Sequence, residues 1–312
     1  MVRMMSAFGV PYFLAVFAVT AVVGLVTSWV DRKVTARVQA RVGPPWFQPF
    51  ADFVKLLGKE TLVPEGSRQK GFLVAPLLAL VGVSLGAAAL VSGGVLGKEG
   101  FIGDIVVVLY LLTIPSAALI LGAASTGNPM ASVGASREMK LILAYELPFL
   151  IVVLTAVYKA QAGFMIDKIV DYQAQNGAFI WSISGVIGFI VAILCIQGKL
   201  GLVPFDAPEA EQELMGGVLT EYSGVPLALF KLSKAMMLSV LTVFLAVIFF
   251  GGMQFKGIDI LWSILKYLVP VVLVVLIRNT NPRLRIDQIM KLFWGPLTVL
   301  ALIALLLARF NL

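Results

Sequence analysis

A chain of 312 residues that is 60% hydrophobic and only 13% charged cannot have water as its main solvent, because soluble domains carry roughly 25% charged residues. Its net charge is +7, and it contains no histidine and one cysteine, Cys195, in an apolar run where packing explains it. This composition excludes a disulfide framework and most ways of holding zinc, haem or an iron–sulfur cluster. We therefore expect a membrane protein that binds no metal or other cofactor itself and has no nucleic-acid partner.

Apolar runs long enough to cross a bilayer as helices, about 20 residues each, recur along the chain. No linker or soluble segment interrupts them, so we predict one all-α, polytopic membrane domain over residues 1–312 with about eight transmembrane helices. The expected spans are Phe8–Val30, Gly71–Gly97, Ile105–Ala124, Leu141–Val157, Phe179–Gly198, Leu227–Phe250, Ile260–Ile277 and Leu292–Ala308.

The loop after the first span contains an amphipathic stretch from Pro44 to Glu60, which predicts a helix at the membrane surface or one docked on a neighbouring span. Lys and Arg gather in this loop and in every second loop after it. By the positive-inside rule these loops are cytoplasmic. We therefore predict a multi-pass protein of the cell (inner) membrane with both termini outside.

Glu146 stands about one turn inside the fourth apolar run, where an ionisable side chain is a functional candidate by default. An ion pair with Arg137 or Lys140 is the alternative interpretation. Lys231 and Lys234 share one face at the start of the sixth span, where cations also serve as simple membrane anchors.

The loop between the fifth and sixth spans is acidic, although it lies on the side where basic residues gather. Crowded carboxylates repel one another, which raises the pKa of some of them and allows protons to be held near neutral pH. If the segment is helical after Pro208, then Asp206, Glu209 and Glu213 line one face. A solvated loop, or one neutralised by the basic loops, is the alternative. The acidic residues are Asp206, Glu209, Glu211, Glu213 and Glu221.

Four segments of the chain resemble a known family. The segment PFDAPEAEQELMGGVLTEYSG, from Pro204 to Gly224, is similar to the acidic loop of the H subunit, also called subunit 1, of respiratory complex I. Three further stretches resemble the same family in the same order: DRKVTARVQARVGPPWFQPFADFVKLLGKE from Asp31, AYELP from Ala144 and LIRNTNPRLRIDQIMKLFW from Leu276. The resemblance covers nearly the whole chain.

The resemblance implies a subunit that joins the membrane arm of an ion-translocating redox complex to its peripheral arm, with no catalytic residue of its own. It implies that a proton path and coupling element comprises Glu146, Asp206, Glu209, Glu211, Glu213, Glu221 and Asp31. It assigns docking of the peripheral arm and the wall of the redox chamber to Arg37, Arg41, Arg283, Arg285 and Asp287.

The motif SREM, Ser136–Met139, looks more like the ferredoxin-linked membrane-bound hydrogenases and their sulfur-reducing relatives. It therefore favours a ferredoxin-dependent complex, with translocation of protons or sodium ions. Expected partners are peripheral subunits with iron–sulfur clusters, a hydrogenase-like large subunit that can hold nickel–iron, antiporter-like membrane subunits, ferredoxin and membrane lipid. The alternatives are subunit 1 of an NADH:quinone oxidoreductase and, outside this class, a secondary transporter.

Overall fold

The computed structural model describes residues 9–97, 104–161, 163–210, 213, 215–253 and 257–310, and within them it contains helices and no strand. Seven helical segments are long and apolar enough to span a membrane, and an eighth, α9, is a shorter apolar helix. The all-α, polytopic prediction is therefore confirmed. The seven long segments are α2 (Val10–Val38), α4 (Gln69–Gly94), α5 (Asp104–Leu111) with α6 (Ile114–Ser125), α7 (Pro129–Ala160), α11 (Gly224–Phe249), α12 (Asp259–Thr280), and α13 (Ile286–Leu292) continued through a π-helix (Phe293–Leu297) into α14 (Thr298–Arg309). The shorter apolar helix α9 comprises Ile183–Lys199.

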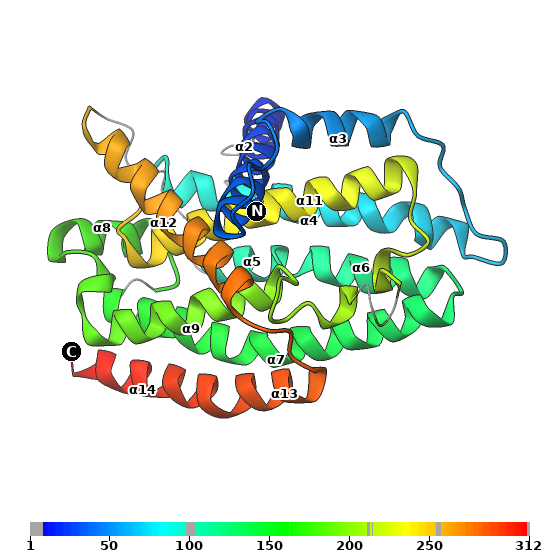
Figure 1. Ribbon diagram of the computed structural model, residues 1–312. Helices are drawn as coiled ribbons and strands as arrows, with labels where there is room; N and C mark the ends of the chain where they lie inside the picture. Colours follow the sequence, from blue (N-terminus) through cyan, green and yellow to red (C-terminus); the bar gives the residue numbers. More distant parts are fainter. Residues whose placement is uncertain are drawn as a thin grey trace.

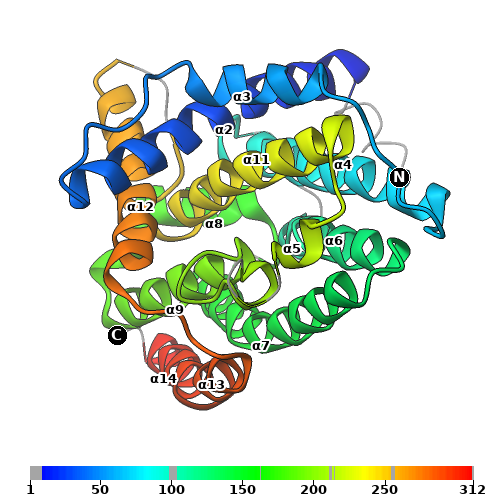
Figure 2. The same ribbon diagram turned by 45° about the vertical axis from the view of Figure 1, so that its right-hand side comes forward.

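The spanning helices form one bundle in which α4, α6, α7, α9, α11 and α14 run alongside one another, whereas α2 and α12 cross them obliquely (Figures 1 and 2). The chain alternates between the two ends of this bundle. We call the end that carries the acidic loop, residues 200–223, the loop face, and the other end the opposite face. Helix α14 ends at the opposite face (Figure 1), and Tyr12, near the start of α2, bonds to Ala88 near the end of α4 on the same side.

Several boundaries differ from the sequence predictions. Helix α7 begins at Pro129, twelve residues before the expected Leu141, because Asn128 caps it by accepting a hydrogen bond from the Met130 amide and Pro129 fits its first turn. The fifth expected span contains a short 3₁₀ helix, η1 (Phe179–Trp181), before α9. Phe8, the expected start of the first span, lies outside the described residues.

The oblique helix α2 touches α11 backbone to backbone. A Cβ atom built on Gly24 would lie 2.9 Å from the carbonyl oxygen of Ala235 and from the amide nitrogen of Met236. Two further contacts hold α2 along its length: the hydroxyl of Tyr12 donates to the Ala88 carbonyl at 3.0 Å, and Thr27 shares a hydrogen bond with Tyr267 of α12. The crossing of α2 and α11 thus depends on the absence of a side chain.

The predicted amphipathic helix is α3 (Gln48–Leu57), which packs on α2 and α11 near the loop face (Figure 1). An ion pair of 2.7 Å joins Arg32 of α2 to Asp52 of α3, and the hydrogen bond from Arg32 lowers the pKa of Asp52 below its ordinary value. Val54 and Leu57 remain exposed, so the helix is docked and also presents an apolar surface outward.

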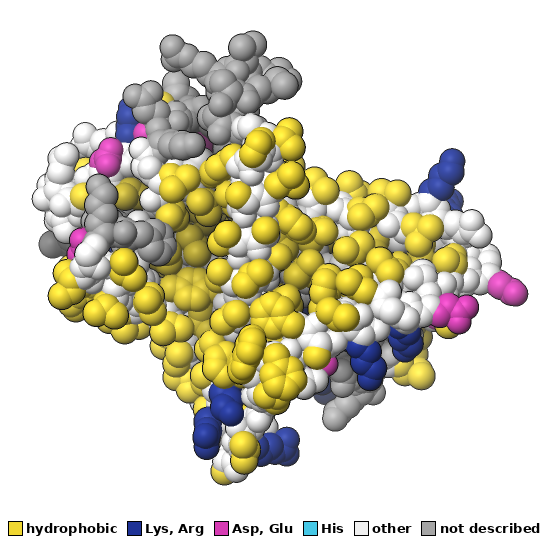
Figure 3. Space-filling model, turned by 90° about the horizontal axis from the view of Figure 1, so that it is seen from above, with side chains coloured by type: hydrophobic (Ala, Val, Ile, Leu, Met, Phe, Trp, Pro, Cys, Tyr) yellow, Lys and Arg dark blue, Asp and Glu magenta, His cyan; other side chains and the backbone are white. Residues whose placement is uncertain are grey.

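The face of the bundle seen in Figure 3 is apolar over a broad area, and its charged side chains lie mainly near the edges of that view. Helix α2 contributes Val19, Val22 and Val26 to the exposed apolar side chains, and α12 contributes Leu261 and Leu265. Such an extended apolar surface requires lipid or neighbouring membrane subunits as its surroundings.

Candidate functional site

The acidic loop does not form the helix that would align its carboxylates. Among its described residues, a short 3₁₀ helix, η2 (Ala207–Glu209), follows Asp206 and ends at the non-helical Ala210. Glu213 is helical, and a second 3₁₀ helix, η3 (Gly217–Leu219), precedes α11. The prediction of one acidic helix face is therefore wrong for Asp206, Glu209 and Glu213, which pair with cations on three different elements. Glu211 lies outside the described residues.

Asp206 ties the acidic loop to the loop that precedes α13. Its Oδ2 lies 2.9 Å from Nε of Arg283, and the neighbouring amide of Leu284 donates to the carbonyl of Pro204 at 3.0 Å. The Asp206 carboxylate is buried and Arg283 is half exposed. Burial raises the pKa of Asp206, and the positive charge of Arg283 opposes that shift.

Glu209 and Glu213 are held by cations of the surrounding helices. Lys234 of α11 donates to Oε2 of Glu209 at 2.6 Å, and Arg137 of α7 donates to Oε2 of Glu213 at 2.6 Å and to the carbonyl of Ala207 at 3.2 Å. Lys234 is thus an ion-pair partner rather than a membrane anchor. Basic neighbours therefore neutralise the charges of Glu209 and Glu213, as one of the alternative interpretations of the acidic loop proposed.

Two further predicted site residues join other elements. Glu221 accepts a hydrogen bond from the Asn128 amide group, which also caps α7. Asp31 of α2 accepts from Arg278 of α12 at 2.8 Å, while its other oxygen is buried without a partner among the described residues. The Asp31–Arg278 pair fastens the two oblique helices together at the loop face.

The remaining residues predicted to dock the peripheral arm form no ion pair with a described residue and are exposed. They lie at the end of α2 and at the start of α13, both at the loop face. These residues are Arg37, Arg41, Arg285 and Asp287.

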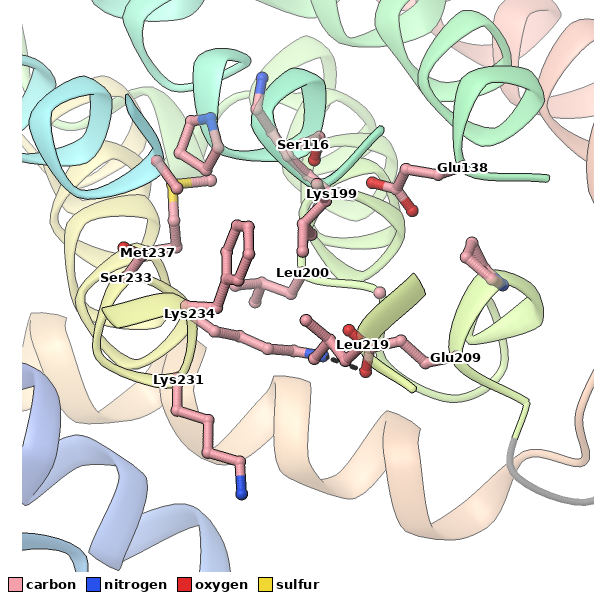
Figure 4. A pocket seen from close by; sticks show the side chains of 16 residues that line it. Ser116, Glu138, Lys199, Leu200, Glu209, Leu219, Lys231, Ser233, Lys234 and Met237 are labelled. Atoms are coloured by element: carbon pink, nitrogen blue, oxygen red, sulfur yellow. Dashed lines mark hydrogen bonds and ion pairs between the residues drawn. The ribbon is translucent and has the colours of Figure 1, made fainter. Parts of the chain in front are cut away.

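A cavity of about 60 Å³ extends from the Glu209–Lys234 pair into the bundle, and it has room for several water molecules. Figure 4 shows the ion pair at one side of this cavity and Glu138 with Ser116 at another. Glu138 is only 6% exposed, and it makes no ion pair with a described residue. Glu138 was not predicted as a site residue because SREM was placed before the fourth span, although Asn128-Pro129 is a helix-start signal that would have moved it inside.

Lys199 is a second site residue that was not predicted. It is the last residue of α9, yet it is 5% exposed and lines the cavity. Its ammonium group lies 5.6 Å from the ring centre of Tyr145 and 5.4 Å from that of Phe149. Aromatic faces attract a cation in this arrangement. A buried ammonium group therefore lies next to the wall of the cavity.

Glu146 lies on α7 eight residues after Glu138, about 12 Å farther along the helix axis. It is half-buried and makes no ion pair with a described residue; its expected partner Arg137 binds Glu213 instead. The negative charge of Glu146 attracts the ammonium group of Lys199, although the two do not form an ion pair. The structure thus brings Glu146 near a cation that the sequence did not single out.

The described residues contain no group of three or more metal-ligating side chains that could hold a metal ion. The polar side chains that line the cavity are carboxylates, lysines and hydroxyls. This set can hold water, carry charge and exchange protons.

Comparisons with known proteins agree with this architecture. The family model described as NADH dehydrogenase matches residues 11–309. The H subunit of the NADH-quinone oxidoreductase of Thermomicrobium roseum is 34% identical over 319 residues, covering 94% of this chain and 93% of that protein. A chain in the solved structure of the membrane-bound sulfane sulfur reductase, an archaeal respiratory membrane complex, superposes with a TM-score of 0.84 at 26% identity, covering 95% of this chain and 98% of the other.

These matches span nearly all of the chain, and they confirm the resemblance to subunit 1 of complex I that the four sequence segments carry. The relatives are membrane subunits of multi-subunit respiratory complexes, which agrees with the apolar outer surface and the exposed charged loop face described above. The chain therefore belongs to the NADH dehydrogenase family, as a membrane subunit of a complex I-like oxidoreductase.

Proposed function

We propose that this chain is the membrane subunit of a ferredoxin-dependent oxidoreductase of the membrane-bound hydrogenase or sulfur-reductase type. It docks the peripheral electron-transfer arm and couples the redox reaction to translocation of protons or sodium ions. The observation that carries this proposal is the cavity that links the Glu209–Lys234 pair of the acidic loop to Glu138 inside the bundle.

The geometry supports coupling by charge. Lys234 and Glu209 attract each other at 2.6 Å, so a redox event that changes the charge above the loop acts directly on this ion pair at the cavity wall. Glu138 is buried in the wall of the same small cavity, so a nearby change of one charge acts on it with weaker screening than at the protein surface. Glu146 and Lys199 continue the series of ionisable groups deeper in the bundle.

The loop face is the docking surface in this proposal. The exposed charges Arg37, Arg41, Arg285 and Asp287 face outward there, together with the ion-paired Arg283. Their partners would be peripheral subunits that carry the iron–sulfur clusters and a hydrogenase-like large subunit, with or without nickel–iron. Antiporter-like membrane subunits would cover part of the apolar surface. We place the loop face in the cytoplasm and both termini outside.

The test of coupling compares Glu138→Gln with Glu65→Gln, a control at an exposed carboxylate that does not line the cavity. In the assembled complex reconstituted in vesicles, the Glu138 variant should lose ion translocation, because Gln cannot exchange a proton, while the control translocates normally. Glu146→Gln should act in the same way, and Glu146→Asp should retain part of the activity. Wild-type translocation in an assembled Glu138→Gln complex would contradict the coupling path.

A quinone-reducing complex is the second candidate, and the 34% identity to a subunit of an NADH-quinone oxidoreductase favours it. Mass spectrometry of the intact complex from native membranes separates the two. Ferredoxin-dependent electron transfer with a hydrogenase-like large subunit supports our proposal. NADH-oxidising subunits in the complex would select the quinone-reducing alternative, and isolation of the chain as an active single protein would indicate a transporter.

A further inference from the structure

A groove at the opposite face, far from the acidic loop, has the composition of a binding site for an amphiphile. It encloses about 520 Å³ between α8 (Ile166–Asn176), η1, the end of α11 and the first half of α12. In Figure 1 this half of α12 extends beside α8 at the left of the molecule. The lining is mainly apolar, and it includes Trp181, Trp262, Leu265 and Val269.

The two tryptophans of the groove mark the level of the membrane interface. Trp181 is 86% exposed and Trp262 is 60% exposed, so both rings face the surroundings rather than the core. Indole rings prefer the level of lipid headgroups, where an apolar body meets a polar layer. From Trp262 the groove continues past Leu265 to Val269, which lie deeper along α12 and present apolar side chains.

One cation stands in this apolar lining. Lys266 begins seven residues inside α12, about 10 Å along the axis from Asp259. Its side chain turns back toward the opposite face and donates to the carbonyl of Gly252 at 3.2 Å, which places the ammonium group at the level of the α11 end. Asp259 attracts it from a distance, but the two do not form an ion pair. The ammonium group has three N–H donors, and those not directed at Gly252 can donate to an anion from outside the chain.

We propose that this groove binds one membrane phospholipid, with its phosphate on Lys266 and an acyl chain along Trp262, Leu265 and Val269. Charge complementarity and depth select this occupant. A lipid phosphate would lie beside the Lys266 cation at the membrane interface, and an acyl chain would lie along the apolar side chains deeper in the groove. A transmembrane helix of a partner protein carries no anionic group of this kind at the interface.

The test uses the purified complex, washed extensively in detergent and titrated with phosphatidylglycerol, and it counts bound lipid by native mass spectrometry. Lys266→Met should lower the lipid retained about fivefold, the effect of one basic residue at an anionic surface. Ala174→Phe, which fills the groove from α8, should remove the bound lipid. Lys168→Met is the matched control, an exposed lysine of α8 outside the groove, and it should retain the lipid.

Three results would overturn the proposal. If wild type and Lys266→Met retain the same amount of lipid, Lys266 does not bind the lipid phosphate. Displacement of the lipid by millimolar inorganic phosphate would show that the site recognises the anion alone. A cysteine at Ala174 that cross-links to a partner subunit in native membranes would show that a protein, rather than a lipid, covers the groove.

Discussion

Replacing Arg283 with Met should destabilise the protein because it leaves the buried carboxylate of Asp206 without its counter-charge. At 2.9 Å and an effective dielectric constant of about 20, the attraction between the two charges is about 6 kcal/mol before desolvation is subtracted. Breaking a fully buried pair costs about 3–5 kcal/mol, and exposed pairs contribute about 0–1 kcal/mol. Because Asp206 is buried and Arg283 half exposed, we expect a loss of about 2 kcal/mol.

The loss should depend on pH with a definite sign. Burial already raises the pKa of Asp206 above 3.8, and removing Arg283 removes the charge that opposes this shift. A carboxyl group whose folded-state pKa is raised destabilises the fold as pH rises past its unfolded pKa. The destabilisation of Arg283→Met should therefore be small below about pH 4 and should grow toward neutral pH. In Arg283→Met/Asp206→Asn neither position titrates, so most of the lost stability should return, and the Arg283-dependent loss should no longer grow with pH.

Thermal midpoints of the purified complex, recorded at one scan rate between pH 4 and pH 8, test this reasoning. The fixed scan rate matters because large membrane complexes unfold irreversibly. A pH-independent loss in Arg283→Met, or a double variant no more stable than the single one, would show that packing around the arginine stem, rather than the buried charge, holds the two loops together.

Three further predictions concern other parts of the chain. Gly24→Ala should lower stability by about 1–3 kcal/mol, measured as a lower thermal midpoint, because the new Cβ meets the backbone of α11. Asp52→Asn should cost less than about 1 kcal/mol, because its pair with Arg32 is exposed. Since the folded-state pKa of Asp52 is lowered, this difference should be present above pH 3.8 and vanish as the pH falls through the lower value, as midpoints at several pH values will show. A cysteine replacing Glu65 should resist a membrane-impermeant thiol reagent added outside intact cells and react in inverted vesicles, with the buried Cys195 silent in both.

The spanning helices could be predicted from the sequence because hydrophobicity and length dominate their placement in a bilayer. Their ends depend on local capping, so the early start of α7 at Pro129 was missed, and with it the burial of Glu138. Cys195 is buried, as its apolar surroundings predicted.

The pairing of the acidic loop could not be read from spacing. Asp206, Glu209 and Glu213 are neighbours in the chain, but their partners come from the α12–α13 loop, from α11 and from α7. Which cation pairs with each carboxylate depends on how helices that are distant in the chain pack together. The sequence alone does not specify this packing. For the same reason the sequence shows Lys199 as an ordinary cation at a helix end, while packing places its ammonium group against two aromatic rings of α7.

The crossing at Gly24 bears on how the protein fits membranes of different thickness. The apolar part of helix α2, from Val10 to Val30, is about 31 Å long, close to the hydrocarbon core of about 30 Å, so a thinner or thicker bilayer creates a mismatch. A single helix absorbs such mismatch by changing its tilt. Here the tilt is fixed by backbone contact with α11 and by the ties to Ala88 and Tyr267. Around this helix, adaptation to thickness therefore falls to the lipids, which must thin or thicken locally to match a rigid, oblique surface.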